Sequence, residues 1–405
     1  MGSPLDEYQR MHESRRAPAE PAGGSEPAPP LWVDVGSWLE SAIPPRPWVV
    51  PGHLMAGTVT LVAGPGGAGK SALTVGWATS LALGISIGEF CPREPVRVAL
   101  YNVEDDKEEQ QRRFSAALRQ FGAAPASIGD RVIRCGPTGV GTLLQRDALL
   151  GEMINTAAFD ALKAMIEAHR PDVLMLDPLV ELHTAVENDN SALRLVIAHL
   201  REIARTYQIA VVVVHHTRKG AVAGEADDIR GGGAIVGAVR TAFTVMAMTA
   251  EEAEELGISA ETRRRFIRLD SCKGNYAPPR EAAWFELTDY ELDNGEVVAA
   301  AVPWNRPQAD PQTAEAMALI EAELARGTAG GPYSPRLVAD QPRSAAALFA
   351  QHGIGTTAAQ KSALRALQAK GWTVQRFRDL DNDPRNGLRS PDGLPKARWF
   401  EGATP

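Results

Sequence analysis

The segment Gly64–Ser71, with the sequence GPGGAGKS, constrains the fold of this chain more than any other part of it. It fits the pattern G-x-x-x-x-G-K-[ST] completely. An apolar run, Thr58–Ala63, precedes it, and the residues after it predict a helix over Ser71–Leu83. Glycines let consecutive backbone N–H groups turn inward around a phosphate, and a helix N-terminus adds a positive partial charge. The sequence therefore predicts a phosphate-binding loop between a buried strand and a helix.

The predicted ATP site takes its ligands from this loop and from the start of the following helix. The Lys70 ammonium would reach the outer phosphates, and the Ser71 hydroxyl would bind Mg²⁺. ATP and Mg²⁺ are thus the expected substrate and cofactor. The residues expected to hold the nucleotide are Gly64, Pro65, Gly66, Gly67, Ala68, Gly69, Lys70, Ser71 and Ala72.

The middle of the chain alternates short apolar segments with helical ones. This pattern indicates an α/β fold with a mainly parallel central sheet that helices cover on both faces. Further strands are predicted over 97–103, 172–176, 209–214, 241–248 and 264–271, and helices over 107–121, 159–169 and 191–207.

The domain organisation follows from shifts in composition along the chain. Residues 1–30, rich in Pro, Ala, Glu and Gly, are expected to be a disordered leader. We expect the α/β domain over 31–300, a linker over 301–312 and a small α+β module over 313–405. In the module, helices over 313–326, 344–351 and 357–370 precede strands over 372–377 and 397–400, which suggests a winged helix.

Charge is unevenly distributed along the chain. The whole chain has 42 Lys and Arg against 50 Asp and Glu, a net charge of −8. Between Lys361 and Phe400, however, nine cations face four acids, a local charge of +5. A basic face of this kind can bind phosphate on an acidic protein, although a merely solvated surface is the alternative interpretation.

We expect a cytoplasmic protein with no membrane partner. The longest apolar runs, such as Ile209–Val214, are far shorter than the roughly 20 residues of a spanning helix. No apolar stretch follows the N-terminal charges as in a secretory signal. The three cysteines, Cys91, Cys135 and Cys272, form neither a CxxC pair nor a disulfide framework.

Asp177 follows the apolar strand segment Val173–Leu176. The carboxyl ends of parallel strands meet at one edge of a sheet, so Asp177 is expected beside the phosphate loop as a Mg²⁺ ligand. A role as a turn or cap residue is the alternative. Asp172 begins the same strand and should lie at the opposite edge.

Glu104 stands at the end of the predicted strand over 97–103, in the sequence VEDD. By the same edge argument its carboxylate faces the γ-phosphate, where it can orient the attacking water as a catalytic base. Asp105 and Asp106 are rivals for this role, although either could instead cap the next helix.

His215 and His216 follow the apolar run Ile209–Val214, at the same edge of the sheet. A histidine there can bind the γ-phosphate and report its loss to the following loop. We favour His215 because it directly continues the strand, and His216 remains open. Metal binding is a weaker alternative, since no Cys or His partners lie nearby in the sequence.

The segment 217–233 is glycine-rich and basic. Its cations, Arg218, Lys219 and Arg230, are candidates for contacts with a nucleic-acid backbone. A surface loop without a ligand is the alternative. Arg240 precedes an apolar strand, and taken alone it is an ordinary surface arginine.

In combination, these segments resemble the RecA-like ATPases, in particular the hexameric replicative helicases of the plasmid RepA type within the AAA family. The resemblance covers about residues 45–290. It rests on GPGGAGKS at 64–71, VED at 103–105, LDP at 176–178, HHTRKG at 215–220, IRGGGAIVGAVRTAF at 229–243 and KGNYAPP at 273–279.

The resemblance implies a RecA-like P-loop core and a homo-oligomeric, hexameric ring with ATP bound between subunits. The catalytic residues would be Lys70, Glu104, His215 and Arg240, with Arg240 reaching the neighbouring subunit's site. The segment 217–233 would face the channel and hold single-stranded DNA. Gly232 and Gly233 depart from the family, whose loops often carry hydroxyl groups there.

The sequence therefore predicts an ATP-hydrolysing, ring-forming DNA helicase or translocase that acts in replication of a plasmid, phage or integrated element. A replication initiator or primase is an expected partner. The alternative is a nucleotide-switched regulatory ATPase that binds DNA or protein without unwinding. A small-molecule phosphotransferase fits least, because no acceptor-orienting residue can be located.

Overall fold

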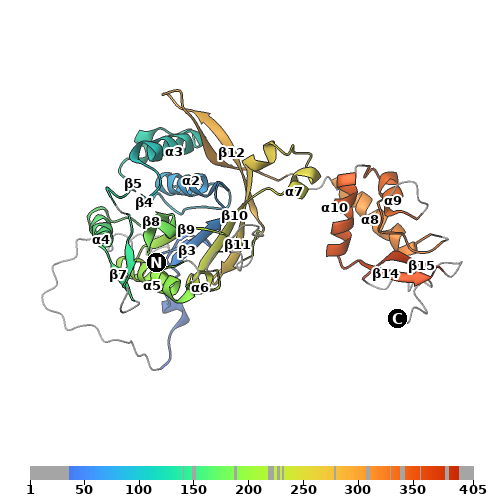
Figure 1. Cartoon of the computed structure of the whole chain (residues 1–405), viewed down its shortest axis with the longest axis horizontal. Helices are drawn as coiled ribbons and strands as arrows, with labels where there is room; N and C mark the ends of the chain where they lie inside the picture. The colour runs from blue at the N-terminus through green and yellow to red at the C-terminus, as the bar shows by residue number, and fades with distance from the viewer. Residues whose placement is uncertain are drawn as a thin grey trace. The chain divides into compact units, whose positions relative to one another are not determined.

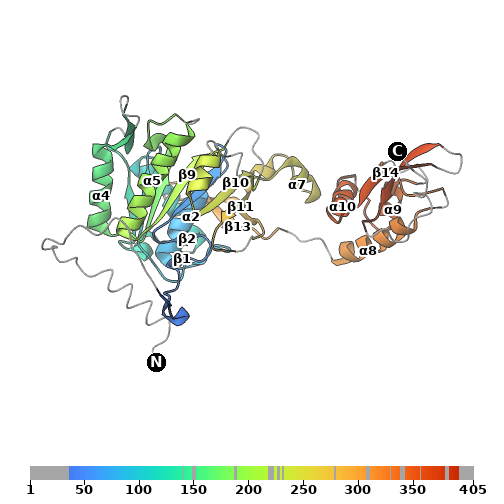
Figure 2. The same cartoon turned by 90° about the horizontal axis from the view of Figure 1, so that it is seen from below.

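The structure is a computed structural model (Figures 1 and 2). It describes residues 36–139, 141–147, 152–186, 189–217, 223–225, 229, 232–277, 280–306, 311–328, 330–337, 343–355, 357–378 and 383–391. The predicted leader, 1–30, lies outside these residues. The chain divides into two compact units, 1–46 and 47–405. The described part of the first contains a short 3-10 helix, η1 (Glu40–Ala42).

A nine-stranded sheet forms the centre of the second unit, in the order β13-β12-β11-β10-β3-β9-β8-β4-β5. Six neighbouring strands run parallel, which confirms the mainly parallel α/β sheet. They are β10 (Thr241–Ala247), β3 (Val59–Gly64), β9 (Ala210–His216), β8 (Val173–Asp177), β4 (Val98–Asn102) and β5 (Val132–Cys135). Three antiparallel strands extend it: β11 (Phe266–Gly274), β12 (Ala283–Glu291) and β13 (Val297–Pro303).

The strand register aligns the carboxyl ends of four parallel strands at one edge. Gly64, the last residue of β3, pairs with His216 of β9. Asn102, at the end of β4, pairs with Asp177 of β8. Strand β9 lies between β3, which leads into the phosphate loop, and β8, which ends in the predicted Mg²⁺ ligand.

Helices cover both faces of this sheet (Figure 1). On one face, α2 (Lys70–Leu83) and α3 (Lys107–Gln120) bury side chains such as Trp77 and Phe114. On the other face lie α4 (Ala157–His169), α5 (Asn190–Tyr207) and α6 (Gly232–Ala238). The interior strands are apolar almost throughout because both of their faces are buried.

Several smaller elements accompany the sheet, and the sequence pattern predicts none of them. They are the antiparallel pairs β1 (Trp48–Val50) with β2 (Leu54–Met55) and β6 (Leu144–Arg146) with β7 (Met153–Asn155), the helix α7 (Ala250–Glu255), and the 3-10 helices η2 (Pro125–Ile128), η3 (Leu179–Leu182) and η5 (Thr262–Arg265). None of the described helices combines the length and the apolar character needed to cross a bilayer.

A small C-terminal α+β module follows, as the sequence predicts. It consists of α8 (Pro311–Arg326), α9 (Ala345–Gln351), α10 (Thr357–Ala369) and the antiparallel hairpin of β14 (Thr373–Arg378) with β15 (Pro384–Arg389) (Figure 2). Its own core includes Ile320, Leu348, Phe349 and Leu367.

Two boundaries in this region differ from expectation. The hairpin's second strand is β15, whereas the sequence pattern placed it at 397–400, which lie outside the described residues. The sequence PRNGLR of β15 contains Pro, Asn and Gly, which are typical of turns, so the pattern hid the strand. In addition, β13 extends to Pro303, three residues into the segment predicted as a linker.

Candidate nucleotide-binding site

The phosphate loop has the backbone conformation that its glycines predict. Gly67 and Gly69 have φ angles of +72° and +81°, in the left-handed region that side chains disfavour. Gly69 is also the N-cap of α2, so the helix begins directly at the loop. A Cβ atom on Gly64 would collide with the carbonyl oxygen of Val245. The loop thus places backbone N–H groups and a helix N-terminus together, as an anion site requires.

The Lys70 ammonium is enclosed by the loop. Its Nζ donates to the carbonyl oxygens of Gly64 and Pro65, both at 2.9 Å, and the side chain is buried. Burial lowers the pKa of Lys70, while the nearby carboxylates of Asp177 and Glu104 oppose that shift. A partly desolvated ammonium gains more from an anionic ligand than an exposed one does.

Ser71 and Asp177 meet at the predicted metal position. Ser71 Oγ donates to Oδ2 of Asp177 at 3.0 Å, and the Asp177 side chain is almost fully buried. Burial raises the pKa of Asp177 to about 6, and the bond from Ser71 acts against this shift. A hydroxyl and a carboxylate are oxygen ligands of the kind that Mg²⁺ prefers, so this pair fits the ion.

The three acids after β4 have different environments. Asp106 is the N-cap of α3, and its side chain accepts the N–H of Glu109 at 2.7 Å. Asp105 forms an ion pair of 3.0 Å with Arg113. Glu104 is exposed, and its carboxylate forms no hydrogen bond or ion pair with any of the described residues. Of the three acids, Glu104 is therefore the one whose carboxylate is least engaged by the described residues around it.

Asn102 shapes this turn, and the sequence analysis missed it. Its buried Oδ1 accepts the N–H groups of Glu104 and Asp105, at 2.8 and 2.7 Å. Burial raises the pKa of the Asp105 carboxyl, and Arg113 opposes this. The signal for Asn102 was its place as a polar residue near the end of the predicted buried strand over 97–103, since a polar residue there needs a local partner.

The structure brings His216, and not the favoured His215, to Lys70. Nδ1 of His216 lies 3.4 Å from Nζ of Lys70. On β9, Val212 packs in the cluster of α2 and α3, and Val213 packs in that of α4 and α5. Side chains alternate along a strand, so His216 shares the α2 face and His215 is buried on the other. His216 therefore lies on the Lys70 side of the sheet, whereas the favoured His215 lies on the opposite side.

Metal binding by the two histidines gains no support from the structure. Within the described part of the chain, no group of three or more His, Cys, Asp and Glu side chains is placed to hold a metal ion.

Arg240 lies away from the phosphate loop of its own chain. Its N–H donates to the carbonyl of Val59 at 3.3 Å, and the register pairs Thr241 with Thr60 at the start of β3. Its guanidinium carbon lies 5.9 Å from the centre of the Tyr276 ring. Five strand residues separate it from Gly64, roughly 16 Å at about 3.3 Å each. The predicted DNA-binding cations Arg218, Lys219 and Arg230 fall outside the described residues.

A groove of about 460 Å³ adjoins the phosphate loop. Ala72 lines one side, Glu109, Arg112 and Arg113 of α3 another, and Leu287 of β12 with residues 296–299 the remainder. A Cβ atom on Gly69 would lie 3.3 Å from Leu287, which shows how closely β12 approaches the loop. The apolar floor suits a nucleobase, and the flanking guanidinium groups of Arg112 and Arg113 both pair with Glu109, at 3.3 and 3.1 Å. Sequence analysis missed this groove because β12 lies more than 200 residues after the loop.

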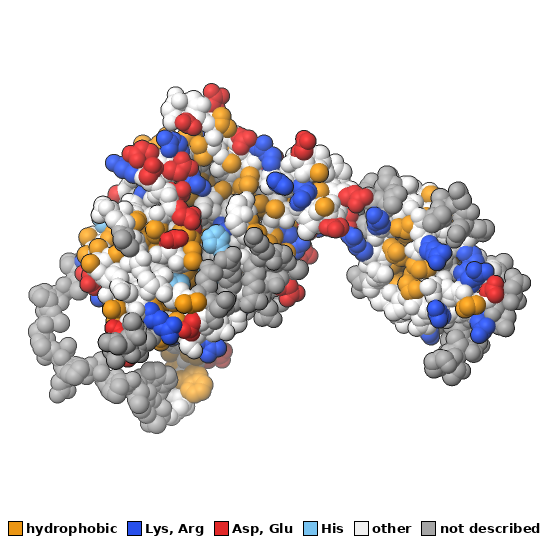
Figure 3. Space-filling view, viewed as in Figure 1, with side chains coloured by type: hydrophobic (Ala, Val, Ile, Leu, Met, Phe, Trp, Pro, Cys, Tyr) orange, Lys and Arg blue, Asp and Glu red, His pale blue; other side chains and the backbone are white. Residues whose placement is uncertain are grey.

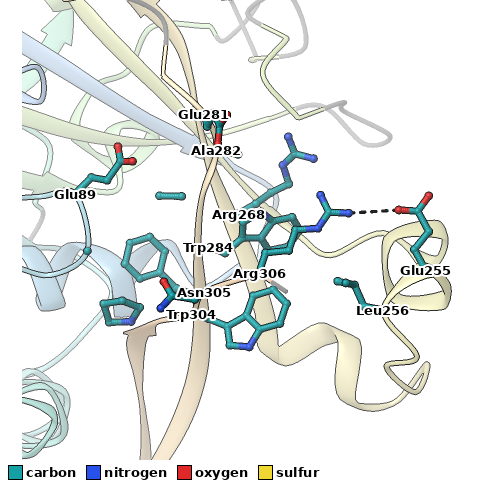
Figure 4. Close-up of a pocket in the computed structure, with 14 residues that line it drawn as sticks. Glu89, Glu255, Leu256, Arg268, Glu281, Ala282, Trp284, Trp304, Asn305 and Arg306 are labelled. Atoms are coloured by element: carbon teal, nitrogen blue, oxygen red, sulfur yellow. Dashed lines mark hydrogen bonds and ion pairs between the residues drawn. The ribbon is translucent and has the colours of Figure 1, made fainter. Parts of the chain in front are cut away.

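A larger groove of about 1240 Å³ lies elsewhere, between α7 and strands β11 to β13 (Figure 4). There the guanidinium carbons of Arg268 and Arg306 lie 5.5 and 5.6 Å from the Trp284 ring centre. Arg306 pairs with Glu255 at 3.3 Å, and Arg268 pairs with Asp270. These cations are neutralised within the groove, and no predicted site residue lines it.

The phosphate loop lies within the part of the chain that matches a known family. Residues 25–222 match a family model described as an AAA domain. Among solved structures, a KaiC-like protein from the hyperthermophilic archaeon Pyrococcus horikoshii OT3 is similar at 13% identity and a TM-score of 0.40. The match covers 62% of this chain and 93% of that chain.

The fold is assigned from the sheet and the loop. In the sheet order, β9 lies between β3, which leads into the phosphate loop, and β8, which ends in Asp177, and this arrangement brings the loop and Asp177 to one edge of the sheet. Together with the complete phosphate-loop motif and the AAA domain match, it gives the chain a RecA-like P-loop ATPase fold.

Proposed function

We propose that this protein hydrolyses ATP with Mg²⁺ and works as a ring-forming motor on DNA. One observation carries the hydrolysis: Lys70, the Ser71–Asp177 hydrogen bond and the available carboxylate of Glu104 lie together at one edge of the sheet. A phosphate site, a metal site and a base are the parts that phosphoanhydride hydrolysis needs.

In the proposed reaction, Glu104 orients a water and accepts its proton as the water oxygen bonds to the γ-phosphorus. The bond from that phosphorus to the β–γ bridging oxygen breaks, giving ADP and inorganic phosphate. Lys70 stabilises the charge that develops on the phosphoryl oxygens, and His216 contacts the same group. Mg²⁺ held by Ser71 and Asp177 would neutralise the β- and γ-phosphates.

The groove beside Ala72 supports ATP as the substrate. A base in this groove would lie against Leu287 and beside the guanidinium of Arg112 or Arg113. Arg113 also holds Asp105, next to the proposed base Glu104. The Arg113 side chain would therefore link binding of a base in the groove to the position of the turn that carries Glu104.

The ring proposal rests on Arg240 and on the resemblance. Arg240 is exposed and too far from the loop of its own chain to contact a γ-phosphate there. It can complete a site only in a second copy of the chain. Supplying this cation from a neighbour would make turnover depend on assembly.

The decisive experiment is steady-state ATP turnover of the full chain, with and without single-stranded DNA, beside a Lys70→Ala control. We expect a several-fold stimulation by DNA that the control lacks. Hydrolysis that does not respond to DNA would reject the motor and favour the nucleotide-switched regulatory ATPase. Equal turnover in the control would reject the assigned site.

A further inference from the structure

The C-terminal module presents a polar, cationic helix face to solvent. On α10, Lys361, Arg365 and Gln368 are all exposed, and their spacing of four and three residues places them on one face. Ala363 and Leu367 are buried on the opposite face, in the core of the module. The core therefore fixes which side of α10 faces outward, and on that side Arg365 also contacts Glu255 of α7.

The β14–β15 hairpin adds cations next to this helix. Arg376 and Arg378 of β14 and Arg385 of β15 are exposed. The hairpin is joined to α10 through the tight turn at Gly371, where φ is +90°. The N–H of Trp372 donates to the carbonyl of Leu367 at 3.0 Å, which ties the start of the hairpin to the helix.

Among the described residues of the module, cations outnumber acidic side chains. The described residues of the module include ten Lys and Arg against four Asp and Glu. Three of the acids, Glu315, Glu321 and Glu323, are on α8. The face of the module visible in Figure 3 accordingly shows mostly Lys and Arg side chains among its charged groups.

The pairing of individual cations supports the same conclusion. Lys361 and Arg376 form no ion pair with the described residues. Arg365 pairs with Glu255 at 3.3 Å, but its side chain remains 54% exposed. Arg385 pairs with Asp383 at 3.4 Å, and its side chain is 52% exposed. Exposed pairs of this kind are weak and exchange readily for a phosphate partner.

From this surface we infer that the module binds duplex DNA, with α10 in the major groove and the hairpin arginines on the phosphate backbone. The groove of B-form DNA is about 12 Å wide and admits a helix, whereas the deep, narrow groove of duplex RNA does not. From Lys361 to Gln368 the helix rises about 10 Å, at 1.5 Å per residue. Arg365 and Gln368 carry donors that can reach base edges.

This inference is independent of the proposed ATPase, since none of its residues belongs to the nucleotide site. The test measures binding of the full chain, without nucleotide, to a labelled DNA duplex of about 20 base pairs over a series of salt concentrations. The variant is the double substitution Lys361→Ala and Arg376→Ala. Its matched control is Lys163→Ala with Arg194→Ala, which removes two cations from helices α4 and α5.

We expect the module variant to lose about tenfold or more in duplex affinity and the control to bind like the unchanged protein. Because each lost phosphate contact lowers the salt slope by about 0.9, the slope should fall by nearly 2. Unchanged ATP turnover in both variants would show that they are folded. Equal loss in both variants, no duplex binding by the parent chain, or tighter binding of duplex RNA or single strands through these cations would overturn the inference.

Discussion

Nδ1 of His216 lies 3.4 Å from Nζ of Lys70, so the last residue of β9 and the first residue of α2 meet over the phosphate loop. His215, one residue earlier, is fully buried on the other side of the sheet. Neighbouring histidines in one strand thus have different environments, because alternate side chains face opposite helical layers.

Replacing the two histidines separately tests this difference. His216→Ala should lower the rate of ATP turnover by about tenfold or more while leaving the melting temperature nearly unchanged, because it removes a polar contact at the γ-phosphate. His215→Ala should instead lower the unfolding free energy by about 1–3 kcal/mol, since it empties a buried position. Turnover and thermal unfolding of both variants separate the roles, and a selective loss of turnover in the His215 variant would reverse the assignment.

Asp177 and Asp172, at opposite ends of β8, provide a matched pair for the metal site. Asp177→Asn should weaken the Mg²⁺-dependent part of ADP binding by about tenfold or more, because an amide is a poorer ligand for Mg²⁺ than a carboxylate. Asp172 accepts the N–H of Arg97 at 2.9 Å. Asp172→Asn should therefore leave the Mg²⁺ dependence intact. Titrations of ADP with and without Mg²⁺ would contradict the metal site if both variants behaved alike.

Glu104 and Asp106 provide a second matched pair of substitutions, within the turn that follows β4. Glu104→Gln should keep ATP binding but lower hydrolysis by about 100-fold, because an amide cannot accept the water proton. Asp106→Asn removes the same charge two residues later and keeps a good N-cap for α3. We expect its turnover to stay near that of the unchanged protein. Single-turnover hydrolysis checks both, and full activity of the Glu104 variant would remove it from the mechanism.

The part of this site that is local in sequence could be predicted. The phosphate loop depends on glycines, a lysine and a hydroxyl within eight residues, flanked by a strand and a helix that their own patterns reveal. Asp177 and Glu104 could be placed because Asp177 ends one buried parallel strand and Glu104 lies two residues after the end of another, and such ends share one edge of the sheet.

The remainder depends on tertiary packing. Choosing His216 over His215 requires knowing which face of β9 is covered by α2, and no local pattern contains this information. The groove residue Leu287 lies in β12, an antiparallel strand whose mixed burial pattern resembles neither a buried nor a regularly alternating strand. Arg113 was predicted only as part of a helix, whereas its ion pair with Asp105 depends on the turn that Asn102 shapes.

Mixing two inactive variants tests whether Arg240 acts in a second subunit. Lys70→Ala and Arg240→Ala should each abolish most turnover alone. In an equal mixture, about a quarter of the interfaces in a ring would combine an intact loop with an intact Arg240, so activity should partly return. Turnover of the separate and mixed proteins is the measurement. Full activity of the Arg240 variant, or no recovery on mixing, would exclude catalysis across a subunit interface.

The burial of His53 predicts that the folded protein loses stability in acid. It is buried, with ring centres 5.2 Å from Phe243 and 5.4 Å from Phe90. Burial lowers its pKa to about 4, and the Arg280 guanidinium lowers it further, against a bond to the carbonyl of Pro51. Between pH 6.5 and 4, His53 is therefore mostly protonated in the unfolded chain and mostly neutral in the folded chain. The unfolding free energy consequently falls as the pH falls.

The expected loss from this group is about 3 kcal/mol across that window, because the pKa of His53 falls from 6.5 in the unfolded chain to about 4 in the folded chain. His53→Gln should be less stable at neutral pH, because it loses the aromatic contacts, yet its stability should decline less steeply toward pH 4. His169→Gln, at an exposed histidine near the end of α4, serves as the control and should keep the parent slope. Urea unfolding at several pH values measures all three slopes. Since an uncharged amide has no proton to take up, an unchanged slope in the His53 variant would mean that another buried group causes the acid sensitivity.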